Sequence, residues 1–488
     1  MSSWDTDSSS DSIPLIVYAN NNRLPGSNDS VAESDSEDNE SIQDNSDTSS
    51  GDSHNDAILL NTDDSDIGPN SPTLSFAIDD PFLENLYQDN INVTAPKPNW
   101  CTPKELYNRE IGKYSSPAIW CNKFYGSMTA VQKLKLVHQL KGHRGCVNTL
   151  DFNPGGDIIA SGSDDQNICL WNWSLGKCLL KYDSGHHENV YQTRFLLSQG
   201  DIRIVSCGRD GLVRLSAVGK SHLYYNKLLA SHYHSCNKLS VHKDLPYVVL
   251  SCGDDGVVKS IDIRESPIYE NVNSTNIQKI CNENGSVVRL FGVDTNPMNS
   301  LEFIVHGDDK FVRMYDKRKL KKEPVKIFCR KGFSMIEGVS HITSAVYNYC
   351  GTEILASYSE DDIYLFDVNS SPDTHLHQYG GHLNKITVKG VNFYGPKGEF
   401  VVSGSDCGHI FIWDKKTEAI VQKKHADANG IVNVLEPHPH IPTLATSGLD
   451  KTIKIWQPLK GCIEPNILKL KKSIIQNRIE RERGIRRD

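Results

Sequence analysis

One pattern recurs along most of this chain and narrows the folds open to it. Each copy consists of an alternating strand, a turn, a second strand that ends in small residues, a polar turn and a third strand with a fixed closing position. The closing residues are Trp171, Ser216, Ile261, Tyr315, Phe366, Trp413 and Trp456, at spacings of 45, 45, 54, 51, 47 and 43 residues. Repeats of this length and strand content predict the blades of a β-propeller.

A polar signature accompanies the repeats. Aspartate stands six residues before the closing position in five of them, and Glu360 and Cys407 stand there in the other two. The aspartates are Asp165, Asp210, Asp255, Asp309 and Asp450, and the histidines that open four repeats are His143, His186, His232 and His382. These features resemble the WD40 family, whose blades join Trp, Ser, His and Asp by hydrogen bonds inside the sheet. The resemblance implies an all-β fold, a seven-bladed WD40 β-propeller, over residues 131–458.

A further alternating segment precedes the first repeat. Leu134, Leu136 and Leu140 alternate with polar residues, yet no blade comes before them. We expect this strand to complete the last blade and close the ring, because a closed ring leaves no open sheet edge. The two longest spacings also predict extra loops at 265–285 and 319–340.

Composition changes on both sides of the repeats. Residues 1–100 hold 20 Asp and Glu and two basic residues, so the rest of a chain with net charge −9 carries +9. Residues 1–75 have too few large apolar side chains to form a core, which predicts a disordered acidic tail. Residues 459–488 predict a basic C-terminal tail with apolar residues at helical spacing, either a solvated helix or one that binds an anionic surface or directs nuclear import.

Residues 76–130 predict a partly helical extension, so that short helices flank the propeller. The clearest candidate begins with a capping box at Thr102 and Glu105, has proline at its first helical position and ends at Gly112. Leu106 and Ile111 then share one side of the helix. That side either packs against the propeller or docks a partner.

Cysteine usage and hydropathy indicate a soluble intracellular protein. The 13 cysteines are odd in number, contain no CxxC pair and are scattered from Cys101 to Cys462, which favours a reducing compartment. No apolar run reaches the 18 to 20 residues or so of a membrane span, and the N-terminus does not resemble a signal peptide. We expect no membrane association, and a location in the nucleus and cytoplasm.

Catalytic chemistry finds little support in the sequence. The His, Ser and Asp residues recur in register with the blades, as expected of an internal hydrogen-bond network. No phosphate-binding glycine loop occurs, and the histidine pairs lack further ligands at zinc spacing. No aromatic and basic stripe suggests direct nucleic-acid binding. We therefore expect a binding scaffold that is not an enzyme and holds no cofactor or metal.

Two neighbouring repeats end differently from the others. The third closes with Ile261-Asp262-Ile263-Arg264 and the fourth with Tyr315-Asp316-Lys317-Arg318, whereas the rest read WNWS, SAVG, FDVN, WDKK and WQPL. Both endings have the order large apolar residue, Asp, any residue, Arg. This order resembles a motif of the WD40 substrate receptors of cullin-4 ubiquitin ligases, in which the motif binds the adaptor damaged-DNA-binding protein 1. The alternative is an exposed arginine after a strand.

Longer stretches strengthen this resemblance, at 143–165, 361–368, 388–414 and 435–456. It implies a non-catalytic substrate-receptor subunit that binds the adaptor and presents an unidentified protein substrate to the cullin-4 ligase. The adaptor-binding residues would be Arg264, Arg318, Asp262 and Asp316, with Leu106 and Ile111 as a rival anchor. The alternative function is a scaffold for complex assembly or trafficking with no role in ubiquitination.

Overall fold

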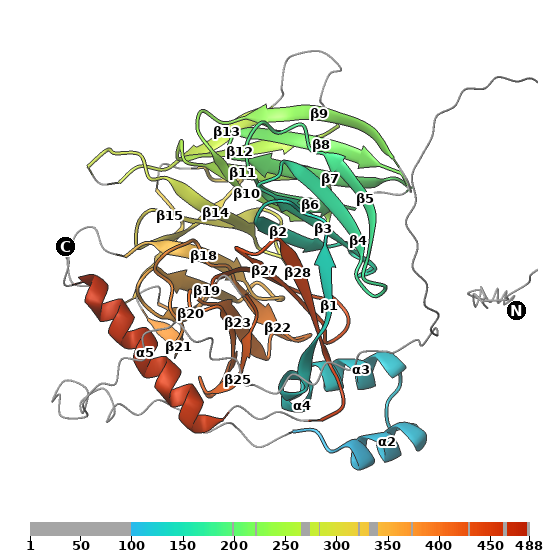
Figure 1. Ribbon diagram of the computed structural model, residues 1–488. Helices are drawn as coiled ribbons and strands as arrows, with labels where there is room; N and C mark the ends of the chain where they lie inside the picture. The colour runs from blue at the N-terminus through green and yellow to red at the C-terminus, as the bar shows by residue number, and fades with distance from the viewer. Residues whose placement is uncertain are drawn as a thin grey trace, which may run out of the picture. The chain divides into compact units, whose positions relative to one another are not determined.

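Seven four-stranded antiparallel sheets make up most of the computed structural model (Figure 1). It describes residues 99–485 apart from 198–199, 220–221, 265–273, 283, 321–322, 331–339, 372–373, 428–429 and 462–465. The acidic tail expected at 1–75 lies outside the described residues. The sheets confirm the seven-bladed β-propeller.

Each sheet is one blade, and its strands follow one another from the inner edge outward. Blade 1 contains β2 (Val147–Phe152), β3 (Ile158–Ser163), β4 (Asn167–Asn172) and β5 (Lys177–Asp183), and blade 2 contains β6 (Val190–Leu196), β7 (Ile202–Gly208), β8 (Leu212–Val218) and β9 (Leu223–Ser231). Blade 3 contains β10 (Cys236–His242), β11 (Leu245–Gly253), β12 (Val257–Asp262) and β13 (Ser274–Lys279), and blade 4 contains β14 (Leu290–Thr295), β15 (Glu302–Gly307), β16 (Val312–Asp316) and β17 (Lys326–Phe328). Blade 5 contains β18 (Ile342–Tyr347), β19 (Glu353–Tyr358), β20 (Ile363–Asp367) and β21 (His375–Tyr379), and blade 6 contains β22 (Val391–Tyr394), β23 (Phe400–Gly404), β24 (His409–Asp414) and β25 (Ile420–His425). Blade 7 contains β26 (Val432–Pro437), β27 (Leu444–Gly448), β28 (Thr452–Pro458) and β1 (Leu134–Lys141).

The outermost strand of blade 7 comes from the start of the repeat region. Strand β1 pairs antiparallel with β28, from Leu134 opposite Pro458 to Lys141 opposite Thr452. The inner strands contact one another from blade to blade, and β26 contacts β2. The expected closing strand is therefore confirmed. The loops expected at 265–285 and 319–340 are corrected in part, because the outer strands β13 and β17 lie within them.

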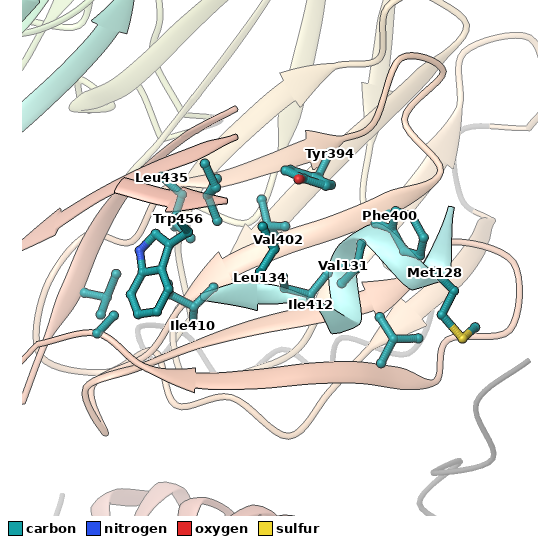
Figure 2. Packing of buried hydrophobic residues seen from close by; sticks show 14 of the residues in the cluster. Met128, Val131, Leu134, Tyr394, Phe400, Val402, Ile410, Ile412, Leu435 and Trp456 are labelled. Atoms are coloured by element: carbon teal, nitrogen blue, oxygen red, sulfur yellow. The ribbon is translucent and has the colours of Figure 1, made fainter. Parts of the chain in front are cut away.

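Helix α4 (Met128–Gln132) leads directly into the closing strand and is part of the core. Met128, Val131 and Leu134 are almost fully buried, in one cluster with Tyr394 of blade 6 and Trp456 of blade 7 (Figure 2). Complete burial of such side chains contributes about 1.5 to 3 kcal/mol each. The residues before β1 therefore help to join blades 6 and 7.

Two earlier helices, α2 (Thr102–Glu110) and α3 (Pro117–Tyr125), correct one detail of the sequence analysis. The N-cap of α2 is Cys101, which makes no capping bond with its side chain. The Glu105 carboxylate instead accepts hydrogen bonds from Lys123, at 2.7 Å, and from the Tyr114 hydroxyl. The capping box was therefore a wrong interpretation, because a charged lysine is a stronger partner for this carboxylate than a backbone N–H. Gly112 does follow the helix, with φ of +71°.

The basic C-terminal segment forms helix α5 (Ile467–Ile485), which packs against blades 5 and 6. Leu470 and Ile474 are buried in a cluster with side chains of both blades. Arg481 donates to the carboxylate of Asp362 at 2.9 Å, and Asn477 donates to the carbonyl of Gly381 at 2.8 Å. The helix is thus anchored to the propeller rather than fully solvated. No helix among the described residues is long and apolar enough to cross a membrane.

Charged side chains from five inner strands gather around the central channel. Arg194 donates to Asp151 at 2.7 Å, and Lys238, Asp294 and Glu436 interact electrostatically with this pair. Burial raises the pKa of Asp294 to about 6 and that of Glu436 to about 8, and it lowers the pKa of Lys238. The Asp294 carboxylate accepts a bond from the Tyr347 N–H at 2.9 Å. Burial thus raises the pKa of the carboxyl groups on this wall, while Arg194 opposes the rise.

Ring closure can be tested by truncation. Deleting residues 1–140 removes α4 and nearly all of β1, so we expect the melting temperature to fall by about 10 °C or more, because several buried side chains and one sheet edge are lost. Deleting residues 1–75 should leave it unchanged. Circular dichroism melts measure both. Equal melting temperatures for the two truncations would contradict closure by β1.

Glu436 predicts a pH dependence of stability. Its pKa in the folded protein is about 8, well above its ordinary value, so the folded state retains a proton that the unfolded state has released between roughly pH 5 and 8. The free energy of unfolding should therefore fall as pH rises through this range. Glu436→Gln stays neutral and should therefore gain stability relative to the wild type as the pH rises from 5 to 9. Urea unfolding of both proteins from pH 5 to 9 measures this, and parallel curves would count against it.

Candidate functional site

The His, Ser and Asp residues of the repeats form an internal network, as predicted. In blade 1, the His143 ring lies between the Asp165 carboxylate, at 3.1 Å from Nδ1, and the Ser161 hydroxyl, at 2.7 Å from Nε2. Trp171 Nε1 donates to the same hydroxyl at 2.8 Å. Ser161 has no exposed surface. A substrate cannot reach this serine, so the network holds the blade together rather than serving as a catalytic triad.

The histidine contacts recur in blades 2 and 3 but are lost in blade 6. His186 and His232 make the same pair of contacts, with Asp210 and Ser206 and with Asp255 and Ser251. In blade 6, Cys407 replaces the aspartate, and within the described residues neither ring nitrogen of His382 has a hydrogen-bond partner. Burial lowers the pKa of His382 to about 3, which keeps the ring neutral. In the part of the chain described, no cluster of His, Cys, Asp and Glu could hold a metal.

The third strand of blade 3 ends in a turn that positions Arg264. Asp262 accepts the backbone N–H of Arg264 at 3.0 Å, a bond that closes the turn. The same carboxylate accepts the guanidinium at both oxygens, from Nε at 3.0 Å and from Nη2 at 2.6 Å. The bond with Arg264 lowers the pKa of Asp262. Asp262 thus shapes the turn and orients the arginine together.

Blade 4 repeats this arrangement. Asp316 accepts the backbone N–H of Arg318 at 2.9 Å, Nε at 3.1 Å and Nη2 at 2.7 Å. The bond with Arg318 lowers the pKa of Asp316 to about 2. The side chains of Arg264 and Arg318 are each 60% exposed. In blade 5, the matching Asp367 accepts Asn369 N–H at 2.9 Å, so blade 5 shares the turn but has no arginine in it.

The two arginines lie on the same face of the ring. Inner and third strands run in the same direction within every blade, and both arginines follow third strands of neighbouring blades. The inner and third strands end at one face of the ring, which we call the arginine face. The inner strands begin at the opposite face, which we call the entry face. The structure therefore brings Asp262, Arg264, Asp316 and Arg318 to one face, one blade apart.

One neighbour of these arginines, Tyr247, was missed in the sequence analysis. The Arg264 guanidinium lies 3.6 Å from the centre of the Tyr247 ring, a cation–π contact that holds it further. In blade 3, the Ile263 N–H donates to the carbonyl of Tyr247. In blade 4, the Lys317 N–H donates to the carbonyl of Leu301, so Leu301 occupies the position equivalent to Tyr247. Burial lowers the pKa of Lys317 to about 8. Only the register between strands, which the sequence did not provide, identifies these contacts.

The rival anchor lies elsewhere on the ring. Leu106 of α2 and Ile111, the residue that caps its C-terminus, are 37% and 56% exposed, so both side chains face solvent. Helix α2 contacts α3, and the chain reaches blades 6 and 7 through α4. These blades are at least two positions from blade 4 around the ring. The six predicted residues therefore form two separate surfaces rather than one site.

Comparison with known proteins identifies the repeats. The family model "WD domain, G-beta repeat" matches residues 134–172, 373–414 and 419–457. The chain contains WD40 repeats. The matched ranges cover the strands of blades 6 and 7, three strands of blade 1 and the outer strand of blade 5. The remaining blades have the same four-stranded form in the structure.

Several curated relatives align with part of the chain. Human DDB1- and CUL4-associated factor 6 is 54% identical over 83 residues, 17% of this chain and 9% of the relative. The protein ALTERED SEED GERMINATION 2 of Arabidopsis thaliana is 30% identical over 282 residues, 51% and 37% of the two chains. WD repeat protein iqw1 of Schizosaccharomyces pombe is 43% identical over 122 residues, 24% and 15% of the two chains. The alignments thus span at most about a third of these relatives.

Proposed function

We propose that this WD40 protein is a substrate receptor of a cullin-4 ubiquitin ligase, which binds the adaptor damaged-DNA-binding protein 1 through its arginine face. The observation that carries the proposal is the repeated pair, Asp262 with Arg264 and Asp316 with Arg318. The partial similarity to DDB1- and CUL4-associated factor 6 supports it, since the name of that protein states this association. Among such factors, the stretches at 143–165, 361–368, 388–414 and 435–456 resemble the eighth most.

The geometry suits recognition by a protein surface. Each guanidinium is oriented by its own aspartate through Nε and Nη2, while more than half of each arginine side chain remains exposed. A carboxylate or carbonyl of the partner would accept from the exposed part of the guanidinium. Because the aspartates fix both forks before binding, little side-chain entropy is lost in the complex. Two such forks one blade apart define an orientation as well as a contact.

The protein would contribute proximity, not chemistry. Holding a protein substrate close to the ligase-bound conjugating enzyme raises the effective concentration of the substrate lysine. The buried His, Ser and Asp network needs no catalytic role in this arrangement, because it stabilises the blades. The alternative is a WD40 scaffold for complex assembly or trafficking without ubiquitination, and it predicts no association with the adaptor.

The arginines provide the decisive test. Arg264→Ala with Arg318→Ala should weaken adaptor binding about a hundredfold or more, because two charge-assisted contacts are lost. Surface plasmon resonance with purified adaptor measures the dissociation constant. Undiminished binding by the folded double variant would reject the arginine mechanism. Absence of binding by the wild type would reject the ligase proposal.

The entry face offers a matched control for this experiment. Arg209 and Arg289 are 61% and 58% exposed, and each is paired with one carboxylate, Glu188 and Asp308. Arg209→Ala with Arg289→Ala therefore removes the same charge and similar exposed surface from the opposite face. We expect this control to bind the adaptor like the wild type, and thermal melts should show that both double variants are folded.

Helix α2 is tested separately. Leu106→Asp with Ile111→Asp places two charges on its exposed side, so the fold should remain intact. If the helix is a second anchor, adaptor affinity should fall about tenfold or more while the arginine contacts persist, since apolar contacts in a desolvated interface are lost. The same binding assay measures it. Wild-type affinity in this variant would limit the adaptor site to blades 3 and 4.

A further inference from the structure

Two adjoining cavities open on the entry face at blades 2 to 4. The inner cavity, of about 590 Å³, is lined by Glu188, Arg209, Tyr233, His234, Asp254 and Arg289, among others. The outer cavity, of about 600 Å³, shares Tyr233, His234 and Asp254 and adds Lys259, Asn276, Lys279 and Val287. The loop that contains Tyr233 and His234 therefore stands between them. Both cavities are open and carry several charged side chains, which suits an extended peptide better than a small apolar molecule.

Tyr233 is held out from the surface by the internal network of blade 3. Its side chain is 88% exposed, although the residue beside it, His232, is buried and bound to Asp255. The Tyr233 N–H donates to the same Asp255 carboxylate at 3.1 Å. The His234 ring lies edge-on to the tyrosine ring at 4.9 Å. The backbone is thus fixed on both sides of an aromatic ring that little else covers, and such a ring offers contact area at low entropic cost.

The inner cavity is lined by three carboxylates, Glu188, Asp210 and Asp254, and two arginines. Arg209 lies 3.5 Å from Glu188, and Arg289 pairs with Asp308 at 2.5 Å. Asp254 accepts a hydrogen bond from the Asn237 amide at 2.7 Å; it interacts electrostatically with Arg289 but forms no close ion pair with a described cation. A carboxylate next to an exposed aromatic ring favours a cationic side chain, since the ion pair and the cation–π contact then act together.

The outer cavity adds two lysines to the shared Asp254. Lys259 and Lys279 line it, and neither forms an ion pair with a described carboxylate. Asp255 also borders this cavity, but its oxygens are already used by His232 and by backbone N–H groups. An acidic side chain is therefore the complementary group here.

We propose that the two cavities form a peptide-binding site that takes a basic side chain in the inner cavity, beside Asp254 and Tyr233, and an acidic side chain in the outer cavity, beside Lys259 and Lys279. The site lies on the face opposite to Arg264 and Arg318, so a bound peptide leaves the arginine face uncovered. Peptide binding stands independently of the ligase. Only its meaning as the site that selects a substrate for ubiquitination rests on the function proposed above.

Defined peptides test the site. The purified full-length protein is applied to an array of nine-residue Gly and Ser peptides that contain one Arg and one Glu, separated by zero to five residues in both orders. Citrulline replaces Arg and Gln replaces Glu in the matched peptides. The best peptide is then labelled with fluorescein and titrated by fluorescence polarisation.

The expected result is retention of a subset of the Arg and Glu peptides, with affinity at least tenfold lower after replacement of Arg by citrulline. Tyr233→Ala and Asp254→Asn should each weaken binding about tenfold, and Lys279→Gln should weaken binding of the Glu peptide but not of its Gln counterpart. Tyr233→Ala removes an exposed ring, so its fold is safe even if Asp254→Asn is unstable. Arg264→Ala with Arg318→Ala is the control from the other face and should bind like the wild type.

Other outcomes overturn the proposal. Absence of any retained peptide, equal binding of citrulline and arginine peptides, or full affinity in the Tyr233→Ala variant would each do so. A preference for peptides with two acidic residues would show that Arg209 and Arg289 dominate the inner cavity, which also contradicts it. No adaptor is present in these assays, so their failure leaves the adaptor proposal intact, and failure of adaptor binding leaves the peptide site intact.

Discussion

The pairing of β1 with β28 is the constraint on which the rest of the structure depends. A row of blades without this pair has two unpaired edges, and each blade covers its apolar face only with its neighbours. With the pair in place, every inner strand has a neighbour on both sides, including β26 and β2. The turns that follow third strands are then fixed relative to one another around the ring. The spacing of Arg264 and Arg318 is a consequence of closure.

Much of this architecture could be predicted from the sequence because it is repetitive. All seven closing residues fall in third strands, and Leu134 to Leu140 fall in the strand that completes blade 7. The period and the alternation are local, so one sequence is sufficient to find them. The structural role of His143 could be predicted for the same reason. A histidine that recurs in register with the blades belongs to their internal hydrogen-bond network rather than to a catalytic site.

What the sequence could not provide depends on contacts between distant segments. Helical spacing predicted a helix near Leu470 and Ile474, but its docking depends on complementary side chains in blades 5 and 6. Glu105 bonds Lys123 because α3 folds back on α2, and a local capping rule cannot include that competitor. At the candidate site, the order Asp, any residue, Arg predicted the paired residues, whereas Tyr247 is recognisable only from strand register. The two cavities require loops of three blades to converge, so no single motif marks them.

The same closing pair has a consequence for how the protein is made. Leu134 pairs with Pro458, 324 residues later in the chain, so β1 leaves the ribosome long before its partner exists. During that interval β1 and the first blades present strand edges to every other nascent chain. Blade 7, and then α5 on blades 5 and 6, are made only after the other blades. The ring therefore closes only once β28 has left the ribosome, and a translation product truncated before β28 would carry an unpaired β1 that exposes it to chaperones.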